Sequence, residues 1–165
     1  MGSIGHPGYE AFKADPASGV TSWTYGVPLC LMPGTGPAVL ESVGPRSTLG
    51  SGFAFLGAGV REFTLTPEHT FIISTDPWPP PTSVVPDPMK AAPGLAVSGP
   101  PCSQYQNGSP YTELLIGLGW TSPDGGGWEG IEITYTVDGS RHVLVLDHDL
   151  MICGTSVDCG SPSTP

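Results

Sequence analysis

Residues 131–148 decide the fold, and they read IEITYTVDGSRHVLVLDH. Across 131–137 large apolar residues alternate with polar ones, which is the period-two pattern of a strand with one buried face. Asp138-Gly139 follows as a hairpin turn, because glycine accepts the positive φ that such a turn requires. The chain then returns as a second apolar strand over 141–148. This stretch predicts an antiparallel hairpin.

The segment before it continues the same pattern. Residues 111–120 place Leu114, Ile116, Leu118 and Trp120 on one face of a strand, and a turn of Pro, Asp and three glycines follows. We therefore predict that 111–120 joins the hairpin in a three-stranded meander.

Glycine and proline shape the rest of the chain. The 165 residues include 24 glycines and 20 prolines, which interrupt almost every window long enough for a helix. Helix-rich folds are thereby disfavoured, and alternating apolar residues indicate strands instead. We expect these at 23–31, 38–43, 53–56, 60–66 and 69–75.

The predicted fold class is all-β. About seven or eight short strands separated by turn signals predict an antiparallel immunoglobulin-like β-sandwich, and a closed barrel is the alternative. We expect one domain over residues 20–154, with a C-terminal tail at 155–165 and a cloning remnant plus linker at 1–19. Residues 76–101 are rich in proline and predict a long loop with polyproline character.

The charge balance excludes some partners. Five basic and fifteen acidic residues give a net charge of −10. Such a chain has no basic patch to neutralise phosphates, and an anionic membrane surface would repel it. Nucleic-acid binding is therefore not expected, and the acidity is most simply a source of solubility.

The four cysteines are Cys30, Cys102, Cys153 and Cys159. They contain no Cys-x-x-Cys pair, so disulfides in an oxidising compartment account for them better than zinc does. Three pairings are open. We favour Cys153–Cys159, which closes a short loop, together with Cys30–Cys102. The chain is expected to be exported, with its signal or membrane anchor outside these residues.

No catalytic motif is present. The sequence lacks a Gly-x-Ser-x-Gly elbow and a phosphate-binding loop, so we expect neither an enzyme nor a cofactor. Exposed aromatic residues are typical anchors of binding sites. We therefore predict a protein-binding surface formed by Trp78, Pro79, Pro80, Pro81 and Trp128. The alternative is that the proline loop covers a sheet edge and these tryptophans only pack.

A metal site is a second functional hypothesis. His148 and Met151 lie close together in the sequence, and imidazole with thioether can hold copper in an oxidising compartment. Met151 is more simply core filling and His148 a residue at a strand end. Asp124, in a glycine-rich loop, lacks the ligand spacing of a calcium loop. We therefore expect no resident metal.

Some segments resemble a known class of protein. Residues 26–31 (GVPLCL), residues 41–45 (ESVGP) and the ending from 131 to 153 resemble small exported immunoglobulin-like domains of high-GC Gram-positive bacteria, many of them lipoproteins of unknown function. The resemblance implies the same fold and compartment, and it supplies no catalytic residues. The expected function is a non-enzymatic interaction or accessory module of the cell envelope, and the alternative is an envelope copper-handling protein.

Overall fold

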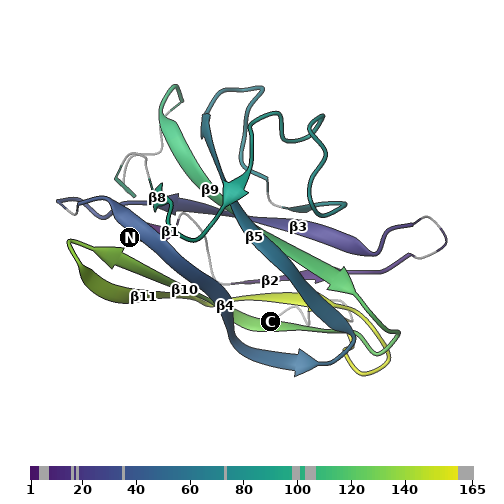
Figure 1. Cartoon of the computed structure of the whole chain (residues 1–165). Coiled ribbons are helices and arrows are strands. Elements are labelled where there is room, and N and C mark those ends of the chain that lie inside the picture. Colours follow the sequence, from purple (N-terminus) through teal and green to yellow (C-terminus); the bar gives the residue numbers. More distant parts are fainter. Residues whose placement is uncertain are drawn as a thin grey trace.

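The protein is a sandwich of two β-sheets (Figure 1). The computed structural model describes residues 1–3, 8–15, 17, 19–34, 36–72, 74–97, 101–102 and 107–159. All regular structure in these residues is strand, so the predicted all-β sandwich is confirmed. No helix able to span a membrane occurs in the described part of the chain.

The strands divide into sheets A and B. Sheet A has the order β1 (Gly2–Ser3), β3 (Ser22–Cys30), β9 (Pro110–Trp120), β5 (Phe53–Thr64) and β7 (Lys90–Ala91), and β6 (Ser74–Thr75) also pairs with β3. Sheet B has the order β2 (Gly8–Phe12), β12 (His148–Ile152), β10 (Gly126–Val137), β4 (Ala38–Gly50) and β8 (Ala96–Val97), and β11 (Ser140–Leu146) also pairs with β10. Four of these strands have two residues, and the immunoglobulin type stays a prediction.

The core lies between the sheets and follows from strand alternation. Leu114 and Ile116 of β9 are fully buried, as are Ile131 and Ile133 of β10. Alternate residues of a strand point to opposite faces, so one set from each sheet fills the interior. A second cluster of Phe63, Leu65 and Tyr111 lies outside this core, against Phe71. The sandwich therefore buries apolar side chains on more than one face.

The hairpin prediction is confirmed, but the meander prediction is wrong. β10 and β11 pair through a turn at Asp138 and Gly139, whose φ values are 49° and 76°. β9 instead belongs to sheet A, and the turn after Trp120 carries the chain across to sheet B. Alternation shows which side chains are buried, but it does not identify the neighbouring strand.

Other strand boundaries also differ from the predictions. The segments 53–56 and 60–66 merge into one strand, β5. Of the predicted strand 69–75, only Ser74 and Thr75 pair, as β6, while Ile73 lies outside the described residues. The proline-rich segment contains β7 and β8, which are short because proline cannot donate to a ladder.

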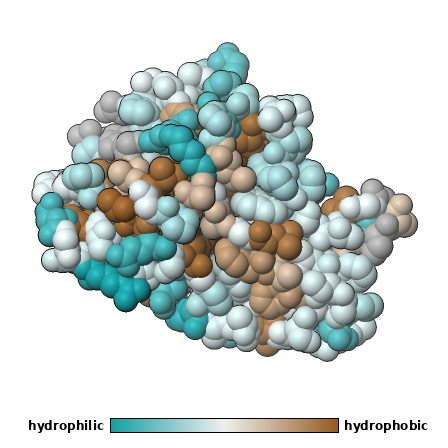
Figure 2. Space-filling view, viewed as in Figure 1, coloured by the Kyte–Doolittle hydropathy of each residue, from teal (hydrophilic) through white to brown (hydrophobic). Residues whose placement is uncertain are grey.

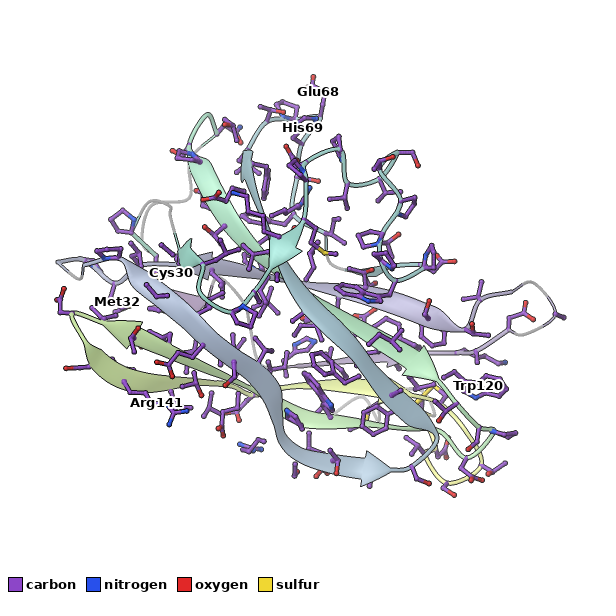
Figure 3. The ribbon with its side chains drawn as sticks, in the orientation of Figure 1. Cys30, Met32, Glu68, His69, Trp120 and Arg141 are labelled. Atoms are coloured by element: carbon purple, nitrogen blue, oxygen red, sulfur yellow. A yellow bond between two sulfur atoms is a disulfide. The ribbon has the colours of Figure 1, made fainter. Side chains whose placement is uncertain are left out.

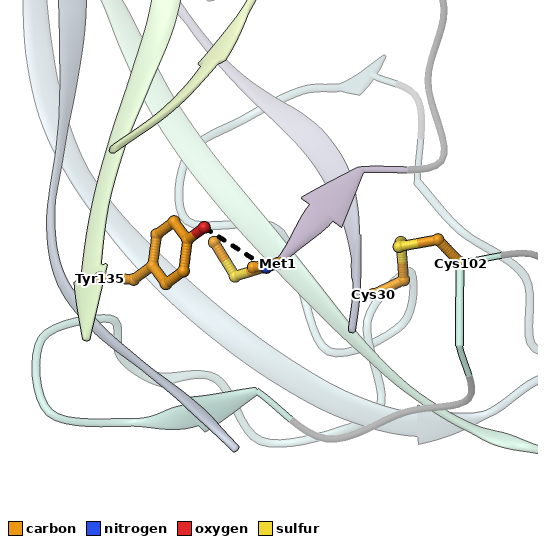
Figure 4. The surroundings of a disulfide bond; sticks show 4 residues. All are labelled: Met1, Cys30, Cys102 and Tyr135. Atoms are coloured by element: carbon orange, nitrogen blue, oxygen red, sulfur yellow. Dashed lines mark hydrogen bonds between the residues drawn. A yellow bond between two sulfur atoms is a disulfide. The ribbon is translucent and has the colours of Figure 1, made fainter. Parts of the chain in front are cut away.

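The predicted linker at 1–19 is wrong for the described residues at the N-terminus. β2 pairs in parallel with β12, and Phe12 is buried in the core. Met1 is also buried, and its amino group donates a hydrogen bond of 3.3 Å to the Tyr135 hydroxyl (Figure 4). At the other end, the predicted tail packs at least as far as Val157, which is 6% exposed. Residues 160–165 lie outside the described residues.

Both favoured disulfides are present. Cys30 pairs with Cys102 at a Cα–Cα distance of 5.0 Å, and Cys153 pairs with Cys159 at 5.3 Å (Figure 4 shows the first). The first joins the end of β3 to a residue 72 positions later, and the second closes a loop of six. This use of cysteine is consistent with an oxidising compartment.

Candidate binding surface

The outer face of sheet A is lined with glycine. Gly57 of β5 pairs with Gly117 of β9, and Gly59 and Gly119 lie two residues further along their own strands. Without Cβ atoms, these residues let other side chains rest directly on the backbone. A methyl group added at Gly117 would overlap the Trp78 ring, and one at Gly59 would overlap the Met89 side chain. We call residues 65–91, which supply Trp78 and Met89, the cover segment.

Trp78 lies where the cover segment meets this face. Its backbone N–H donates to Ser22 Oγ at 3.1 Å, and Thr24 Oγ1 donates to the Pro77 carbonyl at 3.0 Å. Cis peptide bonds occur at Asp76–Pro77 and Trp78–Pro79. The indole is half-buried, so it packs on the sheet with one side while the other remains accessible.

The predicted proline run lies beside it at the surface. Pro79 and Pro81 are exposed, and Pro80 is half-buried. Proline lowers the entropy that a segment loses on ordering, which suits a rigid support for an aromatic side chain.

The prediction that Trp128 belongs to an exposed surface is wrong. Its side chain is 2% exposed and lies in the core between the sheets. The reason is its register: Trp128 is paired with Leu150, which is fully buried. It contacts the surface only indirectly, because its ring packs 5.1 Å from that of Phe55.

Phe55 and Leu56 are the exposed apolar residues that the sequence analysis missed as a site. They are 44% and 42% exposed, at a register shift between Phe55 and Gly57 in the β5–β9 pairing. Phe55 pairs with the core residue Leu118 and packs on Trp128, so it faces the inner side of sheet A, whereas Leu56 rests on Gly119 at the outer face. The signal was the sequence FAFL, because two adjacent large apolar residues in a strand cannot both face one core.

Leu56, Trp78 and Met89 form one apolar surface on the outer face of sheet A, which we call the β5 patch. Leu56 lies against Gly119, Trp78 against Gly117 and Met89 against Gly59, so the three follow each other along this face. Figure 2 shows apolar side chains gathered over the middle of the molecule, where β5 crosses the view. Contiguous apolar surface of this kind is typical of interaction sites.

A buried ion pair holds the cover segment beside the β5 patch. Arg61 Nε donates to Glu113 Oε2 at 2.6 Å, and Arg61 NH2 donates to the Thr70 carbonyl at 2.6 Å. The Ile72 N–H donates to Glu113 Oε1 at 2.7 Å, and Asp87 lies 3.7 Å from the guanidinium. These contacts tie two parts of the cover segment to adjacent strands of sheet A.

Burial raises the pKa of Glu113 to about 7, although Arg61 and the Ile72 N–H oppose this shift. Perturbed acids are frequent at active sites. Glu113 is nevertheless fully buried and Arg61 is 2% exposed, so neither can meet a substrate without opening the cover. The pair is placed for a structural role.

His148 and Met151 do not converge on one site. Leu150 and Ile152 of the same strand are fully buried, so alternation directs His148 toward the interior and Met151 toward the outer face. The His148 ring stacks on Tyr25 at 4.9 Å between centroids. Within the described residues, no three His, Cys, Asp or Glu side chains gather as a metal-binding group.

A shallow pocket lies at one end of the sandwich. It has a volume of about 340 Å³ and is lined by Lys13, Ala14, Trp120, Pro123, Cys153 and Gly154. Asp124, the residue considered for calcium, accepts hydrogen bonds nearby from the hydroxyls of Ser122 and Thr155 at 3.3 and 3.2 Å. These bonds tie together the loops on which the pocket rests.

No protein-family model matches the chain, and no curated protein is similar to it.

Proposed function

We propose that this chain is a non-enzymatic, exported domain of the cell envelope that binds a protein partner through the β5 patch. The observation that carries the proposal is the exposure of Leu56, at 42%, beside the half-buried Trp78 on the outer face of sheet A. Aromatic and aliphatic side chains held on a rigid sheet lose little entropy on binding, which makes them efficient anchors.

The backbone next to the patch favours an extended partner segment. β5 pairs with β7 only through Gly59 and Val60, so among the described residues 53–57 have no strand on the side away from β9. An added strand would use these free backbone groups for affinity and its apolar side chains for contact with Leu56. We therefore propose an extended apolar segment as the partner's contact.

The disulfides support an oxidising compartment, and the net charge restricts the class of partner. Two disulfides leave none of the four cysteines free, which suits an oxidising environment. The net charge of −10 makes a nucleic acid or an anionic lipid surface an unfavourable partner. The resemblance to small exported lipoprotein domains stays a prediction. Copper handling gains no support from His148 and Met151, which face opposite sides of their strand.

Leu56→Ser tests the proposal. Leu56 is 42% exposed and rests partly on Gly119, so the substitution should lower the free energy of unfolding by only about 1 kcal/mol and leave the chain folded. The purified wild-type chain, immobilised and exposed to an envelope extract, should retain a partner that the variant loses. The complex is then rebuilt from the two purified proteins, and its dissociation constant should rise at least about tenfold in the variant.

Met32→Ser is the matched control. Met32 is 49% exposed and lies at the opposite end of the molecule from Trp120 (Figure 3). Trp120 ends the part of β9 that pairs with β5 next to Leu56, so Met32 is far from the β5 patch. This variant should bind the partner as the wild type does. Equal retention by Leu56→Ser, or equal loss by both variants, would remove the β5 patch as the binding surface.

A further inference from the structure

β11 is an edge strand on the opposite side of sheet B from β4. β10 pairs with β4 along one side and with β11 and β12 along the other. β2 covers the outer side of β12, from His148 to Ile152. Among the described residues no strand covers the outer side of β11. An uncovered edge offers backbone donors and acceptors to a further strand.

The hairpin shows which residues offer these groups. Val137 and Ser140 flank a two-residue turn, so they form a hydrogen-bonded pair, and bonded and non-bonded pairs then alternate along the ladder. His142, Leu144 and Leu146 therefore bond to β10. Arg141, Val143 and Val145 direct their N–H and C=O groups to the open side.

The same positions carry exposed side chains suited to strand pairing. Val143 is 52% exposed and Val145 is 44% exposed. Both are β-branched and pack well on a pleated surface. The residues of β10 that pair with these two valines alternate with Ile131 and Ile133, which are buried in the core. Both valines therefore project from the outer face of sheet B.

The charges on this strand complement a second copy of itself. If two β11 strands pair antiparallel about Val143, Arg141 of each copy lies opposite Val145 of the other. Asp147 of the second copy is then the diagonal neighbour of Arg141, within reach of its long side chain. Both side chains are largely solvent-exposed, at 70% and 69%. Within one copy Arg141 pairs with Glu41 at 3.0 Å and Asp147 with Arg46 at 2.9 Å, and exposed ion pairs of this kind are weak enough to exchange for the contact between copies. The twofold axis repeats this opposite-charge contact on both sides.

We propose that two copies of this chain associate through β11 into a twofold dimer in which the two B sheets become one continuous sheet. All three outward-facing residues pair in this register, giving about six backbone hydrogen bonds between the copies. Self-complementary contact of one patch with itself is the usual geometry of a closed dimer. The β5 patch lies on the other sheet and stays free, so the dimer presents two patches on one particle.

The test combines the oligomeric state with amide hydrogen exchange on the full chain. Sedimentation equilibrium should show a concentration-dependent monomer–dimer equilibrium. With rising concentration, the amides of Arg141, Val143 and Val145 should become protected, while those of His142 and Leu144 are protected throughout. A chain that is monomeric up to about 1 mM, the weakest association in the usual range, overturns the proposal. Protection of these amides only by an added foreign protein does the same.

Substitutions on β11 test whether this strand forms the dimer interface. Val143→Lys sets like charges opposite each other at the axis and should weaken the dimer at least about tenfold. Leu49→Lys is the matched control, because Leu49 is 40% exposed on β4 of the same sheet, and it should leave the dimer unchanged. Arg141→Asp should weaken the dimer, and adding Asp147→Arg should restore it. A dimer unaffected by Val143→Lys contradicts the proposal.

Discussion

At the scale of single residues, the contact between Trp78 and Gly117 connects stability to the candidate surface. The indole of Trp78 occupies the space that a side chain at Gly117 would fill. Trp78→Ala should lower the free energy of unfolding by about 2 kcal/mol, since it exposes the apolar face beneath the ring. Gly117→Ala should cost about 1–3 kcal/mol, because its methyl group displaces the ring.

The two changes should not be additive. With the indole gone, the methyl group at 117 has space, so the double variant should be less destabilised than the sum by about 1 kcal/mol or more. Urea denaturation of the four proteins measures this. Gly44→Ala is the control, because nothing lies within 4 Å of a methyl group there. Additive effects would mean that Trp78 does not rest on Gly117.

Glu113 makes stability depend on pH. Its pKa is raised from 4.5 to about 7 in the folded chain, chiefly by burial. Between these values the folded chain retains a proton that the unfolded chain has released, so this group's contribution to the free energy of unfolding falls as pH rises. The contribution is fully present below pH 4.5 and is lost as pH rises through about 7.

Glu113→Gln removes this titration. Thermal melts at pH 5 and pH 8 should therefore show the wild type losing stability relative to the variant at the higher pH. A difference in melting temperature that stays constant, or that moves in favour of the wild type, would contradict the raised pKa.

The tryptophans show what sequence could predict at this scale and what it could not. Both Trp78 and Trp128 are bordered by turn-forming residues, so they looked alike as surface candidates. Trp128 is buried because its strand register pairs it with the buried Leu150. Trp78 instead packs on Gly117, which belongs to a strand far away in the sequence. Both outcomes depend on contacts between strands far apart in the sequence, which local patterning does not contain.

At the scale of elements, local signals predicted local structure. The Asp138-Gly139 hairpin formed as expected because its turn chemistry and alternation lie within one short stretch. The placement of β9 in sheet A and the parallel pairing of β2 with β12 are long-range choices. Strand propensity says nothing about them, so the meander and the N-terminal linker were predicted wrongly.

The two disulfides should differ in their effect on stability. A cross-link removes more entropy from the unfolded chain when it closes a longer loop. Replacing Cys30 and Cys102 by Ser should therefore cost about 4 kcal/mol, and replacing Cys153 and Cys159 about 2 kcal/mol. The sequence separations behind this order are 72 and 6 residues. Guanidinium denaturation measures both, and the reverse order would show that native contacts outweigh loop length.

At the scale of the whole molecule, the two proposed interfaces lie on different sheets. The β5 patch belongs to sheet A and the cover segment, whereas β11 is an edge of sheet B. If both are used, a dimer would bind a partner that carries two target segments more tightly than one copy could, through effective concentration alone. The sandwich thus acts as a rigid frame that separates self-association from partner binding.

The central claim is that the β5 patch contacts a protein partner, and photocrosslinking in intact cells tests it most directly. A photoreactive phenylalanine derivative replaces Leu56 in one strain and Ser42, an exposed residue of β4, in another. Crosslinking from position 56 should yield a discrete adduct with one partner protein, and position 42 should not yield it. No adduct from position 56, or the same adducts from both positions, would contradict the claim.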